Sequence, residues 1–180
     1  MVWTAPMTAA ASNTMTASQY NTHVRDNFLE LGVAKLSGVN GTMVVAGTNN
    51  ITPRYVNGSE IISTDQSTTS ATYTDLATVG PIVTATTGTN ALVIWAASIY
   101  NSLSDVSSTC SYEISGATTR LADTSLELSR DGMSTSGRMR AGMMHFRTDL
   151  VAGSNTFKMK YKVASGTGSF QYRQIIVIPF

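Results

Sequence analysis

The sequence predicts a mainly β protein: an antiparallel, jelly-roll-like β-sandwich preceded by an extended N-terminal arm and one α-helix. Two observations predict the sandwich. From Glu60 onward, candidate strands recur about every ten residues, turns rich in Gly, Ser, Asn and Asp separate most of them, and no helical pattern intervenes. Charged residues make up only 13% of the 180 residues, about half the usual share, as in a β-rich scaffold with neutral outer faces.

We expect four segments: an extended arm over 1–15, an α-helix over 16–32, a linker with short strands over 33–59 and a β-sandwich domain over 60–180. The arm consists mostly of small residues, and Trp3 is its only large side chain. Such a segment has no fold of its own. It is either a frayed terminus or an arm that becomes ordered on neighbouring subunits, with Trp3 and Pro6 filling a partner's groove.

The helix is predicted from its caps and from one apolar stripe. Thr16 is a candidate N-cap, Gln19 follows at capping-box spacing, and Gly32 supplies the stop. This stripe, which we call the helix stripe, recurs at helical spacing. Its residues are Tyr20, Val24, Phe28 and Leu31. A helix of this length is marginal alone in water, so we expect the helix stripe to pack on the β-domain or on copies of itself.

The linker and the domain contain the predicted strands. In the linker, 42–46 reads as a short strand and 49–55, which contains Pro53, as an extended crossing segment. The strands predicted for the domain are 60–64, 71–76, 82–86, 91–100, 109–114, 124–129, 138–148, 155–163 and 169–178. The clearest is 155–163, which alternates apolar residues with three lysines and therefore has one buried and one wet face.

Two strand segments are apolar on both faces: 91–100, which includes Trp95, and 175–178. Both faces of such strands need cover. An inner strand of a two-sheet sandwich has only one covered face, so the second cover must come from the N-terminal helix, another subunit or loops. We expect a homotrimer built around these strands, with the helix stripe on a shared axis and Trp95 at the interface.

A resemblance to a known family enters at the helix. The pattern T-A-x-Q-x-N-x-x-V-R-D-N over 16–27 resembles the N-terminal signature of tailed-bacteriophage virion proteins, labelled minor tail or fibre-like proteins of phages infecting Gram-positive and actinobacterial hosts. Trp3, Pro6 and the R-x-I-I-V-I-P segment at 173–179 match the family plan. The resemblance implies a non-enzymatic structural protein of the virion that attaches by its arm and helix and displays an oligomeric β-domain. The expected interface residues are Trp3, Pro6, Tyr20, Val24, Phe28, Leu31 and Trp95.

The residues that carry catalysis or bind cofactors form no recognisable set. Cys110 is the only cysteine, which excludes an internal disulfide. His23 and His145 lack identifiable partners, the acidic residues are dispersed, and no G-x-S-x-G elbow occurs. We therefore expect no enzyme activity, no cofactor and no metal. The net charge of +1 suggests neither a nucleic acid nor an anionic membrane as partner.

Other functions stay open. A capsid decoration or head-fibre protein would use the same arm and β-domain, and the sequence does not separate tail from capsid. A host receptor or carbohydrate-binding module would bind a cell-surface glycan, with Tyr73, Tyr100, Tyr112 and Tyr172 as the candidates for stacking on sugar rings. No secretion signal and no membrane-spanning segment is visible in the sequence, so we expect synthesis in the host bacterial cytoplasm followed by assembly into the virion with other tail or capsid proteins.

Overall fold

The computed structural model describes residues 14–29, 41–47, 50–131 and 137–180, and the chain divides into two compact units, Met1–Tyr55 and Val56–Phe180. Each unit is described by itself. The predictions made for Trp3, Pro6, Leu31 and Gly32 lie outside the described residues.

The helix of the N-terminal unit begins as the sequence predicts. It comprises α1 (Ala17–Tyr20), the π-helical η1 (Asn21–Arg25) and α2 (Asp26–Leu29). The Thr16 hydroxyl accepts a hydrogen bond from the Gln19 backbone N–H at 3.2 Å, and the Gln19 side chain accepts one from the Thr16 N–H at 2.9 Å. This reciprocal pair is the predicted capping box, and it satisfies two backbone donors that the first turn would leave free.

The rest of the described N-terminal unit is a β-hairpin. Strand β1 (Gly41–Gly47) pairs antiparallel with β2 (Asn50–Tyr55), and Met43 lies opposite Pro53. The prediction that 49–55 would be a crossing segment was wrong, because both strands of a two-stranded sheet are edges, where proline disrupts no second ladder.

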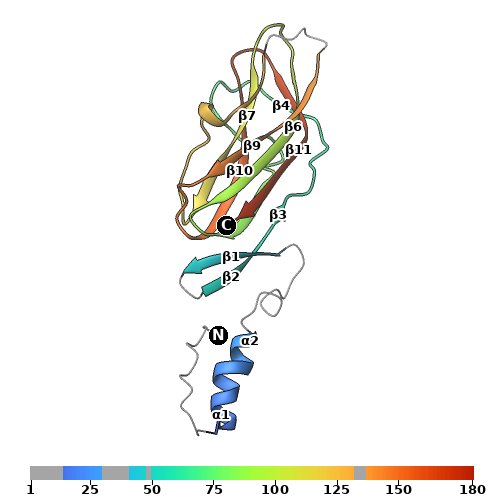
Figure 1. Cartoon of the computed structure of the whole chain (residues 1–180). Helices are drawn as coiled ribbons and strands as arrows, with labels where there is room; N and C mark the ends of the chain where they lie inside the picture. The colour runs from blue at the N-terminus through green and yellow to red at the C-terminus, as the bar shows by residue number, and fades with distance from the viewer. Residues whose placement is uncertain (1–13, 30–40, 48–49, 132–136) are drawn as a thin grey trace. The chain divides into compact units, whose positions relative to one another are not determined.

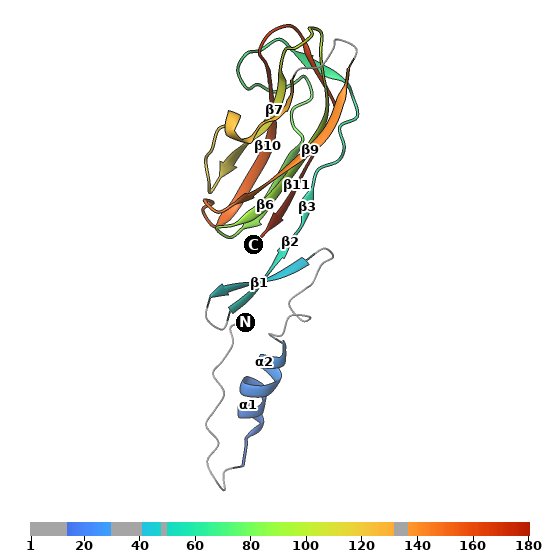
Figure 2. The same ribbon diagram turned by 45° about the horizontal axis from the view of Figure 1, so that its top comes forward.

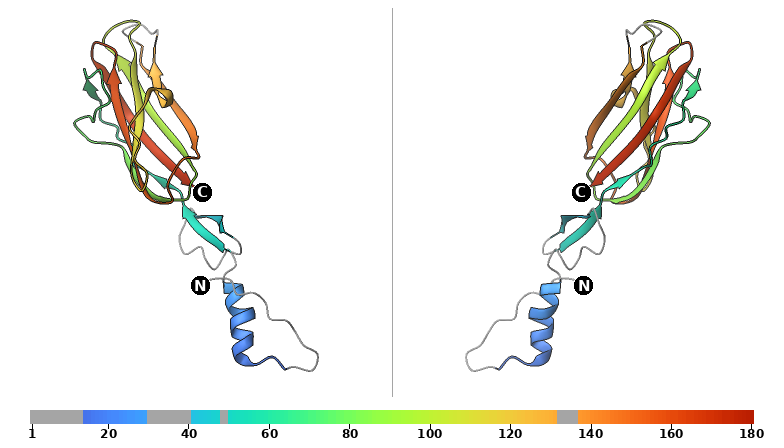
Figure 3. Two further views of the ribbon diagram at one scale, coloured as in Figure 1. Left: turned by 90° about the vertical axis from the view of Figure 1, so that its left-hand side faces the viewer. Right: turned by 90° about the vertical axis from the view of Figure 1, so that its right-hand side faces the viewer.

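The C-terminal unit is an antiparallel β-sandwich, which confirms the predicted fold class (Figure 1). One sheet has the order β5 (Ile82–Thr87), β10 (Gly153–Val163), β7 (Ser108–Gly116), β8 (Leu128–Arg130). The other has the order β3 (Asn57–Gly58), β11 (Gly168–Pro179), β6 (Ala91–Asn101), β9 (Met139–Arg147), and β4 (Gln66–Thr68) also pairs with β11. From β5 onward the chain changes sheet at every connection except β7 to β8, so the two layers are interleaved in sequence, as in a jelly roll (Figure 2 and Figure 3).

Three predicted strands differ in the structure. Segments 60–64 and 71–76 make only isolated bridges, Ile62 with Arg173 and Thr74 with Tyr161. Segment 124–129 is split into a 3₁₀ turn, η2 (Thr124–Leu126), and the short β8. The compact unit also starts at Val56, before the predicted Glu60, because Asn57 and Gly58 already pair with β11. In each case tertiary pairing, rather than local composition, decides where a strand begins.

The core lies between the sheets and follows the predicted alternation. Along β10, Phe157, Met159 and Tyr161 are fully buried, while the lysines at 158, 160 and 162 point outward and form ion pairs with carboxylates. Trp95 of β6 packs edge-on against Tyr112 of β7, with ring centroids 4.9 Å apart. This pair joins the two sheets through aromatic contact.

One of these ion pairs makes the stability of the domain depend on pH. Lys160 Nζ lies 2.9 Å from Asp75 Oδ2. Burial by itself would raise the pKa of Asp75, but the hydrogen bond and charge of Lys160, helped by Lys158, hold that pKa below its ordinary 3.8. A lowered folded-state pKa stabilises the fold above the unfolded-state value, and this contribution is lost as the pH falls through the folded-state value.

We therefore expect Asp75→Asn to lower the free energy of unfolding by about 1 kcal/mol at neutral pH and to have little effect once the pH is well below 3.8. Melting curves of both proteins across this range measure the difference. A gap between the two proteins that stays constant with pH would contradict the assignment.

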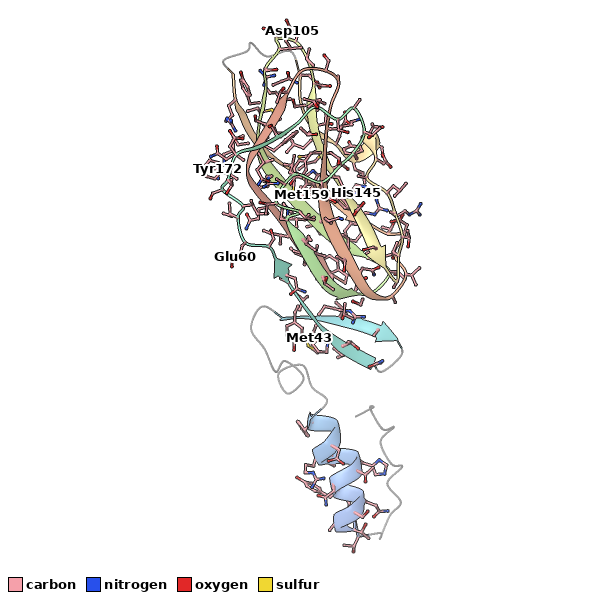
Figure 4. The ribbon with its side chains drawn as sticks, turned by 180° about the vertical axis from the view of Figure 1, so that it is seen from behind. Met43, Glu60, Asp105, His145, Met159 and Tyr172 are labelled. Atoms are coloured by element: carbon pink, nitrogen blue, oxygen red, sulfur yellow. The ribbon has the colours of Figure 1, made fainter. Side chains whose placement is uncertain are left out.

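Strand β11 contains a bulge that brings an arginine into the core. Between Gln171 and Gln174 the register with β6 shifts, and Tyr172 adopts a φ of 51°, which is unusual for a residue other than glycine. The bulge leaves Tyr172 exposed, as labelled in Figure 4. It turns Arg173 inward, where that side chain is fully buried.

Candidate functional sites: an apolar sheet face and a polar edge pocket

The first candidate site is the outer face of the five-stranded sheet, on the side away from the core. Directly paired residues of an antiparallel sheet share a face, and two rows of apolar residues cross β11, β6 and β9 in this way. One row is Ile178, Leu92 and Phe146, and the other is Ile176, Ile94 and Met144. We call these residues, together with Ala96 and Phe180, the outer face.

The outer face is open to solvent in the described domain. Met144 is 68% exposed and Phe146 51%. The Phe146 ring lies 5.8 Å from the Phe180 ring, so the aromatic surface continues past the end of β11. Monomeric proteins rarely expose large continuous apolar patches. Within the described residues of the C-terminal unit, the second face of the two-sided apolar strands is therefore left partly open to solvent.

Charged and aromatic residues border the outer face toward the far end of β6. Arg140 lies over the Tyr172 ring at 4.9 Å, and Arg138 lies 5.8 Å from the Tyr100 ring centroid. Arg138 also forms an ion pair with Asp65 at 2.6 Å. An apolar centre with polar and cationic residues at its border is the usual composition of a protein interface.

The residues expected at an interface differ in how exposed they are in the structure. Tyr20 and Phe28 of the helix stripe are exposed and Val24 is partly buried. Trp95, in contrast, is fully buried in the sandwich core, so its assignment to an interface was wrong. Alternation along β6 points Trp95 inward and its neighbours Ile94 and Ala96 outward. The sequence analysis missed Met144 and Phe146, although alternation along 138–148 could have placed them together on one face.

The second candidate site is a cavity of about 220 Å³ at the edge of the sandwich. We call it the edge pocket. It lies between β7 and the edge strand β9, and the connection from β7 to β8 completes its wall. His145, labelled in Figure 4, belongs to this wall. At its rim, Asp149 forms ion pairs with Arg147 at 2.7 Å and with Arg120 at 2.9 Å.

Three residues of the pocket wall each contain a buried polar atom without a hydrogen bond of good geometry within the described part of the chain. These atoms are Tyr112 Oη, Arg147 Nε and His145 Nδ1. Tyr112 is 3% exposed and Arg147 8%. Burial raises the pKa of Tyr112 to about 12, against the opposing effect of Arg147, so its hydroxyl stays protonated. Each of these atoms is closed off from solvent, so none of them faces the open volume of the edge pocket.

The four tyrosines considered for sugar stacking are largely engaged within the domain. The Tyr73 hydroxyl donates to Glu127 at 3.1 Å and its ring carries Lys162 at 4.8 Å. Tyr100 is partly buried, Tyr112 is buried, and the exposed Tyr172 has Arg140 over its ring. These four tyrosines therefore do not form a set of free ring faces on which a sugar could stack.

The residue types that would support other chemistry are placed in the core or dispersed. Cys110 is buried, and burial raises the pKa of its thiol. No group of three or more His, Cys, Asp or Glu side chains suited to a metal ion occurs within 14–29, 41–47, 50–131 and 137–180. Among the described helical residues, no helix is long and apolar enough to cross a membrane.

No protein-family model and no curated protein sequence matches this chain. Among solved structures, it is similar to Eiger TNF from S. frugiperda, with 12% identity, 71% of this chain and 93% of that chain covered, and a TM-score of 0.40. It is also similar to the CBM22-1 xylan-binding domain from Paenibacillus barcinonensis Xyn10C, with 7% identity, 80% and 84% coverage and a TM-score of 0.35. A third is the carbohydrate binding module CBM6cm-2 from Cellvibrio mixtus lichenase 5A, with 14% identity, 81% and 92% coverage and a TM-score of 0.29. At these identities the likeness is one of β-sandwich fold alone.

Proposed function

We propose that this protein is a non-enzymatic structural subunit of a phage particle, a minor tail or fibre-like protein whose β-domain assembles into a homotrimer through the outer face. In this proposal, the N-terminal arm and helix attach the subunit to the particle and the β-domain is displayed. The observation that carries the assembly part of the proposal is the outer face itself, a continuous apolar surface on β11, β6 and β9.

A second copy of the chain is the partner that best fits the outer face. Its two central rows contain no charged residue, so they can form no ion pair with a charged partner. Covering them is favourable because apolar area is removed from water. Soluble oligomers are mostly symmetric assemblies of one chain. Tyr20 and Phe28 of the helix stripe are exposed and form a second apolar surface on the same chain. A shared axis would cover this surface in every copy at once.

The link to a virion rests on the resemblance of the helix signature over 16–27. Within that signature, Thr16 and Gln19 form the capping box, and Arg25 pairs with Asp26 at 2.8 Å. These residues are therefore used to build the helix, which leaves Tyr20 and Phe28 free to contact a partner. A capsid decoration protein would use the same surfaces, and immunogold labelling of virions separates tail from capsid.

Changing Met144 to aspartate should convert the oligomer to a monomer without unfolding the domain. Met144 is already 68% exposed, so the carboxylate stays hydrated in a free protomer, but it would be buried unpaired in an assembled one. The matched control is Val151→Asp, at a loop residue that is 58% exposed and does not belong to the outer face; its backbone N–H donates to the Thr118 hydroxyl at 2.8 Å. Mass photometry gives the mass of each protein, and circular dichroism reports folding.

We expect the wild type and Val151→Asp to have the mass of a trimer and Met144→Asp that of a monomer. The sandwich should be folded in all three, and Met144→Asp should melt at a lower temperature because it lacks the stabilisation that assembly provides. A monomeric wild type at micromolar concentration would overturn the proposal. A trimeric Met144→Asp variant would show that another surface joins the copies.

A further inference from the structure

Strand β9 leaves one edge of the five-stranded sheet open (Figure 2). It pairs with β6 over nine residues without a register shift. Beyond this ladder, no backbone hydrogen bond from the described part of the chain reaches β9. In an edge strand, about every second N–H and C=O points away from the sheet. Strand β9 therefore presents a row of unpaired backbone groups along its whole length.

The opposite edge of the same sheet is covered. Beside β11 lie β3, β4 and the chain between them. The Ser59 N–H donates to the Ile175 carbonyl at 2.9 Å, and Ile62 and Arg173 exchange two backbone hydrogen bonds at 3.0 and 3.1 Å. Proteins also protect edges with proline, lysine or a bulge, and β9 has none of these. The sheet is thus closed along β11 and open along β9.

The side chains of β9 also lack cover on both faces. On the inner face, Met143 packs against the core but stays only partly buried, whereas its direct partner in β6, Trp95, is fully buried. On the outer face, Met144 and Phe146 are exposed. A further strand beside β9 would cover all three of these side chains and pair the free backbone groups.

Residues 3–11 of the N-terminal arm have the sequence of such a strand. In this segment every odd-numbered residue is apolar, and most even-numbered residues are not, which is the period of a strand with one apolar face. The segment is as long as β9 and contains no charged residue, so it would bring no unpaired charge beside Met144 and Phe146. The odd-numbered residues are Trp3, Ala5, Met7, Ala9 and Ala11.

Pro6 determines which side of this segment can pair. Proline has no N–H, but an added strand pairs along one side only, so proline fits where its nitrogen faces solvent. The backbone groups of the other even-numbered residues, such as Thr8, then also face away from β9. Those of odd-numbered residues, such as Ala9, face β9. The odd-numbered side chains share one face, so Trp3 can extend the apolar surface of Phe146.

We propose that residues 3–11 of a neighbouring copy add to the free edge of β9 as one more strand, with Trp3 on the side of the outer face. Backbone hydrogen bonds supply the attraction, and the apolar side chains beside Met144 and Phe146 select the face. This inference rests on the proposed function, because it names the surface that the arm engages in the particle. The assembly places each arm at high local concentration near its neighbour.

The test is hydrogen exchange of the β9 amides in the full chain, followed by mass spectrometry. Ala9→Pro removes an N–H that bonds to β9. Thr8→Pro is the matched control, because it adds the same residue one position earlier, where the N–H faces solvent. Neither change touches a described residue. We expect the β9 amides to exchange roughly tenfold faster in Ala9→Pro and at the same rate in Thr8→Pro as in the wild type.

A synthetic peptide identifies the source of the strand. A peptide of residues 1–13, added to the full-length Ala9→Pro protein, should restore slow exchange of β9, and a peptide that itself contains Ala9→Pro should not. Because the strand comes from another copy, dilution of the wild type to the monomer should also speed the exchange. Mass photometry of the same samples reports the oligomeric state.

Equal exchange rates in Ala9→Pro and Thr8→Pro would overturn the inference, and slow exchange that persists in a monomeric wild type would show that each arm binds its own chain. The outcomes separate the two proposals. A trimer with equal rates in both variants refutes the added strand and leaves assembly through the outer face standing. A monomeric wild type together with protection of β9 by the peptide refutes the trimer and supports β9 as the site for the arm.

Discussion

Replacing Arg173 with alanine should lower the free energy of unfolding of the sandwich by about 3–4 kcal/mol and its melting temperature by about 10 °C or more. Arg173 is fully buried. Its guanidinium group donates to the Gln66 side chain at 2.9 Å and to the backbone carbonyls of Gly80 at 3.3 Å and Thr78 at 3.4 Å. It also lies 5.4 Å from the centre of the Tyr161 ring.

The large effect has two sources. Alanine leaves a cavity where the long side chain was, and it removes donors from acceptors that water cannot easily reach. Within the described residues no carboxylate pairs with Arg173, so the side chain acts through carbonyl groups and packing. It joins β11 to the segment before β5 and so fixes a part of the chain that has few ladder hydrogen bonds of its own.

Two further variants separate these contributions, and denaturant unfolding measures them. Arg173→Met keeps most of the volume and loses the donors, so it should fall between wild type and alanine. Arg140→Ala is the matched control, because Arg140 is an exposed arginine of the same sheet, and it should change the free energy by less than about 0.5 kcal/mol. Arg173→Ala with the stability of Arg140→Ala would refute the role of the buried arginine.

Changing Phe28 to aspartate should abolish incorporation into the particle while leaving the β-domain folded. Phe28 is 66% exposed, so a charge there costs the free protomer little. If the helix stripe is covered in the particle, the same charge is buried without a partner, at a cost of several kcal/mol for each copy. Val24→Asp should have the same effect, because Val24 lies one turn earlier on the helix stripe.

The control for this experiment is Arg25→Gln on the same helix, at an exposed residue that pairs with the adjacent Asp26 at 2.8 Å. Complementation with each variant, followed by quantification of the protein in purified virions, gives the incorporated fraction. Thermal unfolding of the isolated variants gives the state of the sandwich. Normal incorporation of Phe28→Asp would mean that attachment lies in the arm or in the β-domain.

Strands with one clear apolar face were predictable from sequence. Segments in which only a single residue pairs with a neighbouring strand were not. Strand β10 is the best case, since its lysines mark the outward positions. The residues between them must then point inward. In 60–64 and 71–76 the composition favours strand, but only Ile62 and Thr74 find a bridge partner. Local propensity contains no information about whether a neighbouring edge is free to pair.

The two candidate sites were predictable to different degrees. Apolar residues on both faces of 91–100 indicated a surface in need of cover, and the outer face is that surface. Because this segment does not alternate between apolar and polar residues, the sequence did not show which of its residues point outward. For that reason Trp95 was assigned to the interface. For the edge pocket, His145 and Tyr112 could be identified from sequence only as isolated residues more than thirty positions apart. Their side chains reach one cavity only because the two sheets pack together and bring β7 and β9 close to each other.

The sequence by itself determined the capped helix, the neutral composition and the succession of short strands, because each depends on residues close together in the chain. The tertiary structure alone decided the rest. A register shift at Tyr172 turned Arg173 into the core, and alternation relative to the partner strands made Ile94 rather than Trp95 an outer residue. The packing of the two sheets brought Tyr112, His145 and Arg147 to the wall of one pocket. These outcomes depend on which strands meet and in which register, which is set by long-range burial and not by any local pattern.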